Sequence, residues 1–516
     1  MQFVCDFNGR GLPDRPRGRP AQPNPHVNPA LHSKVRGRPD IIFFMTDQQR
    51  WDALGVVNPE VMTPTLDRLA GGGVRFSQAV CQAPMCVPSR ISMMTGRYPS
   101  DLGLGDNDDP TPADDQLPVP PLPEMLRRAG YATAGFGKTH WGRCGSLPGT
   151  RGFETRVVGC REVGEERGVT LWQDDDDGAG LSRYRQEVAD YGPGEEGANG
   201  YLGTVSSVPS HQHRDGWVAE QALRWLEADR VDKTKPLFFY LSFLKPHAGH
   251  NPPAEFAQLY RDRSATTPGQ PPWEEEHGTH LAVLDRASAF HRERHAEWRE
   301  AFRARGEEAL VRSRQLYFAN CTWLDHQVDR ALAALDRLGR LDNALIVFLS
   351  DHGEMMGERR GRFSKYCFYE SSIRVPLILS GSALPSAWRG SEQDRLVELV
   401  DVYPTLAAVA GLPASSSPRG ENLFEPGRRA AGFAELCTSG LRASMWRTQT
   451  HKLIRFAREG GTDQGGELYD LRKDPAEWNN LYNDPAMLPL RKELDQQLEA
   501  RLLLLGDNVA GPGGAS

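Results

Sequence analysis

The chain has 516 residues, of which 39% are hydrophobic and 25% are charged, a composition typical of globular proteins. The length allows one large domain with a smaller one, or three domains of average size. A formal net charge of −7 gives no general attraction to nucleic acid or to a membrane surface, so we expect neither as a partner.

The cysteines and the apolar segments bear on the cellular compartment. Eight cysteines are scattered along the chain without the spacing of a disulfide framework. No apolar run approaches the roughly 20 residues of a membrane span, and the N-terminus lacks the apolar core of a secretory signal. We therefore expect a cytoplasmic protein.

Residues 1–39 differ in composition from the rest of the chain. They are rich in proline, arginine and glycine and show almost no apolar periodicity. This pattern predicts a disordered arm, or residues that lie ahead of the true translation start. An arm that binds nucleic acid is a weaker alternative, because no aromatic residues are interleaved to stack on bases.

The first predicted strand is the uninterrupted apolar run Asp40–Thr46, which fits a parallel strand that is buried on both faces. Directly after it come Asp47 and Gln48, at the strand end where open α/β sheets bind their ligands. A short helix over Thr63–Ala70 and a second strand over Val74–Val80 are predicted next.

The second strand leads into a segment in which Cys86, Pro88 and Arg90 form the pattern C-x-P-x-R. Proline suits the first turn of a helix and Gly96 suits its C-terminal stop, so we expect Cys86 just before a helix N-terminus. There the helix dipole favours anions, and Arg90 directs a cation to the same place. On chemistry alone, Cys86 is either a thiolate nucleophile or a small buried residue.

Two later strands also end in basic side chains. The strand predicted over Tyr131–Phe136 is followed by Lys138 and His140, and the strand predicted over Pro236–Phe243 is followed by His247.

The most strand-like run, Asn343–Ser350, ends in Asp351 and His352. Asp47 and Asp351 are far apart in the sequence, but both follow buried strands and would meet at the C-terminal edge of one sheet. Oxygen donors from both strand ends form the kind of ligand set that a hard divalent cation prefers.

Helices and loops are predicted between these strands. Amphipathic patterns predict four helices, over Leu122–Gly130, Asp215–Leu226, Arg312–Leu338 and Asp401–Gly411. The acidic, glycine-rich stretch 163–200 is predicted as a solvated loop whose position suits a substrate-selecting insertion. Residues 268–305 are predicted as helices of a variable insertion. Three histidines of this insertion match no standard metal spacing and are expected to be solvated: His277, His280 and His291.

The composition turns loop-like near residues 418–426, where we place a domain boundary. Three parts are thus predicted: an arm at 1–39, a catalytic α/β domain at 40–425 and a C-terminal α+β subdomain at 426–516. Three strands and a final helix are predicted in the last part, over Arg442–Arg447, His451–Phe456, Glu467–Leu471 and Leu488–Leu505.

The C-x-P-x-R segment and the following Thr95–Pro99 resemble the signature of the type I sulfatases, in the alkaline-phosphatase-like superfamily. Gly137–His140 and Glu467–Leu481 resemble further elements of that family, so that the resemblance covers about residues 40–505. It implies an α/β fold with a large, mostly parallel sheet flanked by helices, plus a small C-terminal antiparallel sheet with a packed helix.

The resemblance also implies a chemistry. In that family the motif cysteine is oxidised after translation to formylglycine, whose hydrated aldehyde is the nucleophile. Cys86 would be this residue, and a formylglycine-generating enzyme would be a partner. The implied reaction is the hydrolysis of a small-molecule sulfate monoester to an alcohol and sulfate, and a homo-oligomer is compatible with it.

The resemblance assigns roles to the candidate site residues. A divalent cation, Ca²⁺ before Mn²⁺, would be held by Asp47, Gln48, Asp351, His352 and the modified Cys86. Positive charge around the sulfate group would come from Arg90, Lys138 and Lys365. His247, or Lys365 in its place, would protonate the leaving oxygen, and His140 would act as base on the hydrated aldehyde. His250 is the alternative to His247, because an Ala-Gly insertion blurs the alignment there.

Gln48 and His352 mark a variant of the family pattern. Many sulfatases carry Asp-Asp and Asp-Asn at these two places, and the variant resembles choline sulfatases and phosphonate monoester or phosphodiester hydrolases. Fewer ligand carboxylates leave the site more positive, so a phosphonate monoester or phosphodiester hydrolase is the alternative function. A non-catalytic binding protein is disfavoured because every expected position is filled, and the intact C-x-P-x-R argues against a retained thiol at Cys86.

Overall fold

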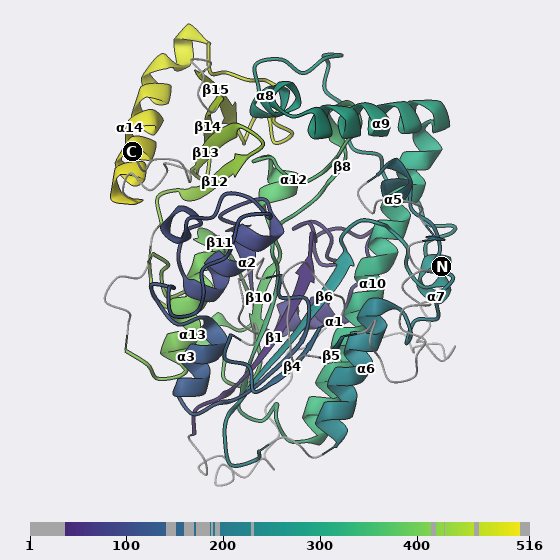
Figure 1. The fold of residues 1–516 in the computed structure, drawn as a ribbon, viewed down its shortest axis with the longest axis vertical. Coiled ribbons are helices and arrows are strands. Elements are labelled where there is room, and N and C mark those ends of the chain that lie inside the picture. The colour runs from purple at the N-terminus through teal and green to yellow at the C-terminus, as the bar shows by residue number, and fades with distance from the viewer. Residues whose placement is uncertain are drawn as a thin grey trace, which may run out of the picture. The chain divides into compact units, whose positions relative to one another are not determined.

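The computed structural model describes residues 37–140, 151–158, 170–171, 186, 189–190, 197–228, 232–413, 419–427, 429–458 and 464–505. Within residues 38–516 a nine-stranded sheet forms the main layer (Figure 1). In spatial order its strands are β11 (Ser391–Glu398), β2 (Val74–Val80), β10 (Leu377–Ser380), β7 (Ala344–Ser350), β1 (Asp40–Asp47), β6 (Leu237–Pro246), β3 (Ala132–Gly137), β4 (Thr155–Val158) and β5 (Thr170–Leu171). Strand β10 is antiparallel to both of its neighbours and all other pairs are parallel, which confirms the predicted mostly parallel sheet.

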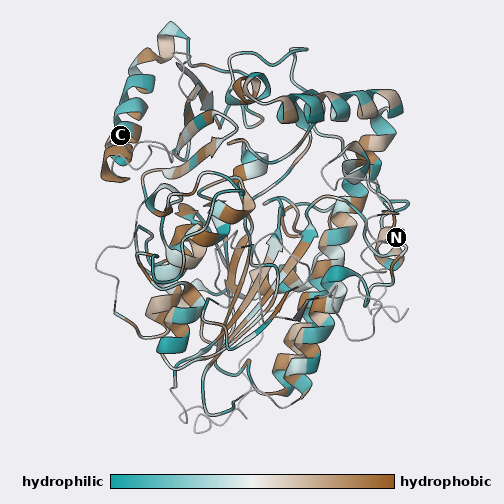
Figure 2. Cartoon of the chain, in the orientation of Figure 1, coloured by the Kyte–Doolittle hydropathy of each residue, from teal (hydrophilic) through white to brown (hydrophobic). Residues whose placement is uncertain are grey.

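The two faces of the sheet bury separate hydrophobic clusters. All eight residues of β1 are buried, as the continuous apolar run predicts for a central parallel strand. Ile42 and Phe44 share one cluster with residues of α1 (Pro64–Gly72), α6 (Arg214–Glu227) and α10 (Glu307–Arg337). Ile41 and Phe43 share the other with α2 (Cys86–Thr95), α3 (Leu122–Arg128) and α13 (Val402–Val409). Figure 2 shows the mostly hydrophobic strands beside helices that carry both hydrophobic and hydrophilic residues.

A second, four-stranded sheet is built from the C-terminal part of the chain. Its antiparallel strands, in order, are β12 (Gly432–Thr438), β13 (Leu441–Arg447), β14 (His451–Arg458) and β15 (Gln464–Asp470). The final helix α14 (Leu488–Leu505) packs Leu494 and Leu498 with Leu453 and Leu468 of this sheet. The small antiparallel sheet with its helix is as predicted, whereas β12 is an additional strand.

The insertion between β6 and α10 contains α8 (His280–Ala287) and α9 (Ala289–Arg305), in agreement with the predicted helices. The expectation that His280 is solvated is wrong, because its side chain is fully buried and its Nδ1 lies 2.5 Å from Glu467 Oε1. Burial by itself would raise the pKa of Glu467, but His280 and Arg359 lower it to about 2. Spacing alone could not reveal this pair, since the small sheet supplies the carboxylate.

Shorter elements complete the described chain: η2 (Ser100–Leu102), α5 (Ala198–Leu202), α7 (Ala254–Gln258), β8 (Met355–Gly357), α11 (Glu358–Gly361), β9 (Arg362–Ser364), α12 (Glu370–Ile373), η4 (Ser386–Trp388), η5 (Leu399–Asp401) and η6 (Pro485–Met487). The acidic stretch 174–177 and most of the predicted loop at 163–200 lie outside the described residues. In the part of the chain that the structure describes, no helix combines the length and apolarity needed to cross a membrane. The proposed domain boundary near residue 425 stays a prediction.

Candidate active site

The two strand ends that carry the predicted carboxylates lie side by side. Strands β1 and β7 are parallel neighbours, and their register sets Thr46 opposite Ser350. The next residues, Asp47 and Asp351, are therefore adjacent at the C-terminal edge of the sheet. This is the edge at which parallel α/β sheets bind ligands, and it is where the sequence predicted a cation site.

The strands on the other side of β1 bring in the basic groups. Register places Asp47 opposite Pro246 of β6, so His247 follows at the same edge. Strand β3 runs parallel to β6, and the backbone N–H of Lys138 donates to the carbonyl of Ser242 at 3.0 Å. Four neighbouring parallel strands thus deliver the candidate residues to one place.

Cys86 enters this place from helix α2. It is the first residue of the helix, with Met85 as the N-cap, and not the residue before it as predicted. Gly96 ends the helix with a φ of 63°, in agreement with the predicted stop. The N–H of Val87 donates to Asn107 Oδ1 at 2.9 Å, so a side chain with no predicted role occupies part of the helix N-terminus.

The sulfur of Cys86 is surrounded by predicted site residues. It lies 3.3 Å from His352 Nε2, 3.3 Å from Lys365 Nζ, 3.7 Å from Asp47 Oδ1 and 4.0 Å from Lys138 Nζ. One ligand atom from each of four buried residues lies within 4.8 Å of the others: Asp47, Cys86, Asp351 and His352.

Arg90 joins the two carboxylates of the site. Its Nε donates to Asp351 Oδ2 at 2.7 Å and its Nη2 donates to Asp47 Oδ2 at 3.0 Å. Lys138 Nζ lies 2.7 Å from the same oxygen of Asp47. Burial raises the pKa of Asp47, but Lys138 and Arg90 outweigh it and hold this pKa well below its usual 3.8, so the carboxylate is ionised.

Hydrogen bonds fix the tautomers of two histidines. His352 Nδ1 lies 2.9 Å from the carbonyl of Gly353 and must donate to it, which leaves the lone pair of Nε2 facing Cys86. His247 Nδ1 likewise donates to the carbonyl of Ala248 at 2.9 Å, so its Nε2 accepts from Lys365 Nζ at 2.9 Å. Burial lowers the pKa of His352.

His140 and His250 differ in their positions. His140 follows Lys138 at the end of β3, and burial together with the charge of Lys138 holds the pKa of His140 well below 6.5. His250 is fully buried, with its ring 5.5 Å from that of Tyr201 and 5.3 Å from that of Tyr317. Of the two histidines considered for proton donation, His247 is the one that contacts Lys365.

Other residues around the site had no predicted role. Ser242 Oγ accepts from Arg90 Nη1 at 3.2 Å, and Gln48 Nε2 donates to Glu354 Oε2. Glu354 stands three residues after Asp351, so the spacing along the motif is a signal that could have pointed to it. No sequence signal links Ser242 to Arg90, because that contact depends on how β6 packs against α2.

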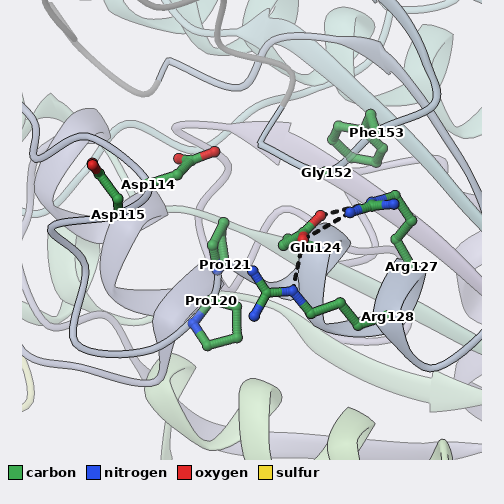
Figure 3. A pocket seen from close by; sticks show the side chains of 9 residues that line it. All are labelled: Asp114, Asp115, Pro120, Pro121, Glu124, Arg127, Arg128, Gly152 and Phe153. Carbon is green, nitrogen blue, oxygen red and sulfur yellow. Dashed lines mark hydrogen bonds and ion pairs between the residues drawn. The ribbon is translucent and has the colours of Figure 1, made fainter.

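A pocket of about 430 Å³ lies elsewhere, at the start of α3 (Figure 3). Figure 3 shows Glu124 directed toward Arg127 and Arg128, with which it forms ion pairs at 2.7 Å. Two prolines, Gly152, Phe153 and two aspartates complete the lining, and none of the predicted site residues belongs to it. Within this lining, Glu124 and the two arginines balance one another's charge.

Comparison with known proteins agrees with this geometry. Residues 39–412 match the sulfatase family model, and residues 440–502 match a model described as N-sulphoglucosamine sulphohydrolase, C-terminal. An arylsulfatase of Clostridium perfringens is 28% identical over 90% of this chain and 95% of its own. A choline-sulfatase of Rhizobium meliloti is 28% identical over 87% of this chain and 83% of its own.

Solved structures share the fold. The phosphonate monoester hydrolase of Agrobacterium radiobacter superposes with a TM-score of 0.72 at 24% identity, over 91% of this chain and 96% of its own. BT4656, in complex with its substrate D-glucosamine-2-N,6-O-disulfate, gives a TM-score of 0.69 at 23% identity, over 92% of this chain and 100% of its own. Because the family model matches most of this chain, the chain belongs to the sulfatase family, the sulfuric ester hydrolases of the alkaline-phosphatase-like fold.

Proposed function

We propose that this chain hydrolyses sulfate monoesters with a formylglycine derived from Cys86 and one bound divalent cation. The observation that carries the proposal is the position of the Cys86 side chain. Its sulfur lies 3.3 Å from both His352 Nε2 and Lys365 Nζ, beside the two carboxylates that Arg90 joins. A side chain placed in this way can meet a cation and an anionic substrate at once.

The donor set fits a divalent cation. Asp47 is held ionised, His352 presents an unprotonated Nε2, and Gln48 adds an amide oxygen. These residues, together with Asp351 and the modified Cys86, would hold the ion. Oxygen donors favour Ca²⁺, and the imidazole keeps Mn²⁺ as the second choice. When bound, such an ion polarises the ester and favours deprotonation of an oxygen nucleophile.

Three cations of the chain bind and orient the sulfate group. Arg90, Lys138 and Lys365 converge on Cys86 from α2, from the end of β3 and from the loop after β9. All three are at least 94% buried in relative accessibility, so water screens their charge poorly. Their field favours the negative charge that develops on the non-bridging and leaving oxygens.

Two histidines handle protons. His247 Nε2 shares a hydrogen bond with Lys365 Nζ, so a proton held between these two atoms is available to the departing alcohol oxygen. His140 is neutral at pH 7 because burial and Lys138 lower its pKa, and a neutral imidazole can accept a proton as a base.

A phosphonate monoester or phosphodiester hydrolase is the second candidate function. The observation in its favour is the charge of the site, in which Gln48 and His352 are neutral while Arg90, Lys138 and Lys365 gather beside Asp47 and Asp351. Rates on 4-nitrophenyl sulfate and on an aryl phosphodiester, measured on the same preparation, decide between the two. We propose the sulfate ester as the better substrate, because the relatives are named sulfatases.

Mass spectrometry of the tryptic peptide Phe76–Arg90 tests the proposal. The protein would be produced in the cytoplasm together with a formylglycine-generating enzyme, which is the proposed maturation partner. We expect Cys86 to lose its sulfur and to appear as the aldehyde or its hydrate. Cys81, in the same peptide, is the internal control and should remain an alkylatable thiol after unfolding. A fully alkylatable Cys86 contradicts the proposal.

A further inference from the structure

The side-chain amide of Gln48 is held at both ends. Its Oε1 accepts a hydrogen bond from Lys365 Nζ at 3.0 Å, and its Nε2 donates to Glu354 Oε2. An ammonium group can only donate and a carboxylate oxygen accepts, so both neighbours require the same orientation of the amide. Gln48 and Glu354 are fully buried, so bulk water does not compete for either contact.

The backbones of both residues are also fixed. Gln48 has a φ of 65°, which is uncommon for a residue other than glycine. Its N–H donates to Asp351 Oδ1 at 2.9 Å, and its carbonyl accepts from the Tyr317 hydroxyl at 2.7 Å. The N–H of Glu354 donates to the carbonyl of Ser371 at 2.9 Å, and its own carbonyl accepts from Arg50 Nη1 at 2.8 Å. The contact between the two side chains therefore joins two rigid segments.

We propose that Glu354 is a positioning residue, which holds the Gln48 amide with its oxygen directed toward Lys365 and the cation ligands beside Cys86. The inference rests on the proposed cation site. An aspartate offers an oxygen at either end, but glutamine offers one oxygen and one nitrogen, so its value as a ligand depends on a partner that fixes the amide. A reversed amide would set its N–H₂ group against the Lys365 ammonium.

Two neutral replacements separate this role from a simple charge effect. Glu354→Gln and Glu354→Leu remove the same charge, but only glutamine keeps an oxygen that accepts from Gln48 Nε2. We expect Ca²⁺ to bind at least about 10-fold more weakly to Glu354→Leu than to Glu354→Gln, the usual scale for losing a partner of a metal ligand. Calorimetric titration of the full chain with CaCl₂ measures this ratio, and equal affinities would overturn the proposal.

Exchanging the side chains at positions 48 and 354 conserves the total charge and gives an independent test. It is carried out in chelator, so that no bound cation contributes. Gln48→Glu sets two carboxylates against each other and should lower the thermal midpoint of unfolding. Adding Glu354→Gln restores a donor and an acceptor, with the amide now at position 354 and the carboxylate at position 48. We expect the double variant to recover most of the loss. A loss equal to the sum of the two single losses would show that the contact is not made, and would overturn the proposal.

The two tests distinguish this proposal from the proposed function. If the wild-type protein binds no Ca²⁺ or Mn²⁺, the cation site of the proposed function fails. The exchange of Gln48 and Glu354, measured in chelator, still decides whether Glu354 orients Gln48. Glu435→Leu is the matched control. It removes another buried carboxylate, which accepts from the Ser100 N–H, and should lower the thermal midpoint without changing the affinity for Ca²⁺.

Discussion

Replacing Arg90 with lysine should destabilise the protein although the positive charge is kept. The guanidinium makes four hydrogen bonds from a side chain that is 1% exposed: to Asp351, to Asp47, to the Lys138 carbonyl at 2.9 Å and to the Ser242 hydroxyl at 3.2 Å. A lysine ammonium cannot span both carboxylates and the carbonyl. Losing one hydrogen bond to a buried charged group and leaving one buried acceptor unpaired should lower the free energy of unfolding by about 3 kcal/mol.

Urea-induced unfolding in chelator, followed by tryptophan fluorescence, measures this difference without a contribution from bound cations. Arg68→Lys is the matched control, because Arg68 pairs with Asp329 through side chains that are 62% and 50% exposed. An exposed pair contributes less than about 1 kcal/mol, so the same substitution should change little there. If Arg90→Lys and Arg68→Lys have equal unfolding free energies, the argument that Arg90 holds the two aspartates together is refuted.

Three further predictions concern pH, the nucleophile and the cation. Burial raises the pKa of Glu435 from 4.5 to about 7 although the Ser100 N–H opposes it, so its contribution to stability is present below pH 4.5 and is lost as the pH rises through 7. Glu435→Gln keeps the acceptor but cannot ionise. The free energy of unfolding of this variant, relative to that of the wild-type protein, should therefore rise by about 3 kcal/mol between pH 4.5 and 8; a constant difference would contradict this. Cys86→Ala should lower the rate of 4-nitrophenyl sulfate hydrolysis by about 10³-fold or more, with an unchanged circular dichroism spectrum; retained turnover would exclude Cys86 as the precursor of the nucleophile. Ca²⁺ at about 100 times its dissociation constant should add about 2.7 kcal/mol to the free energy of unfolding, and Asp351→Asn should abolish most of this gain; an equal gain in the variant would place the ion elsewhere.

Much of the fold follows from local patterns in the sequence. The central strands β1, β3, β6 and β7 are continuous apolar runs, and a run of that length bounded by polar residues has few other solutions. The edge strand β11 was not predicted, because its first five residues are polar and only partly buried or exposed, and only its last three residues are buried. Strand β12 was missed for a different reason. The strand has only seven residues, and the loop-like stretch before it gives no signal of where it begins.

The candidate site divides in the same way. Cys86, Lys138 and Asp351 were found because each follows or begins an element with a strong local pattern. The pairing of His280 with Glu467 and the contact of Gln48 with Glu354 were not found, since each joins residues that are far apart in the chain. Nothing local to either partner indicates which polar group it will meet.

The sequence by itself determined which chemical groups stand at the ends of the buried strands, because strand formation and helix capping are governed by neighbouring residues. Only the tertiary structure decided which atoms of those groups meet. Gln48 and Asp351 are 303 residues apart, and their contact depends on the register of β1 against β7. That register, like the choice of tautomer at His247 and His352, is set by packing and by partners that fold in from distant segments.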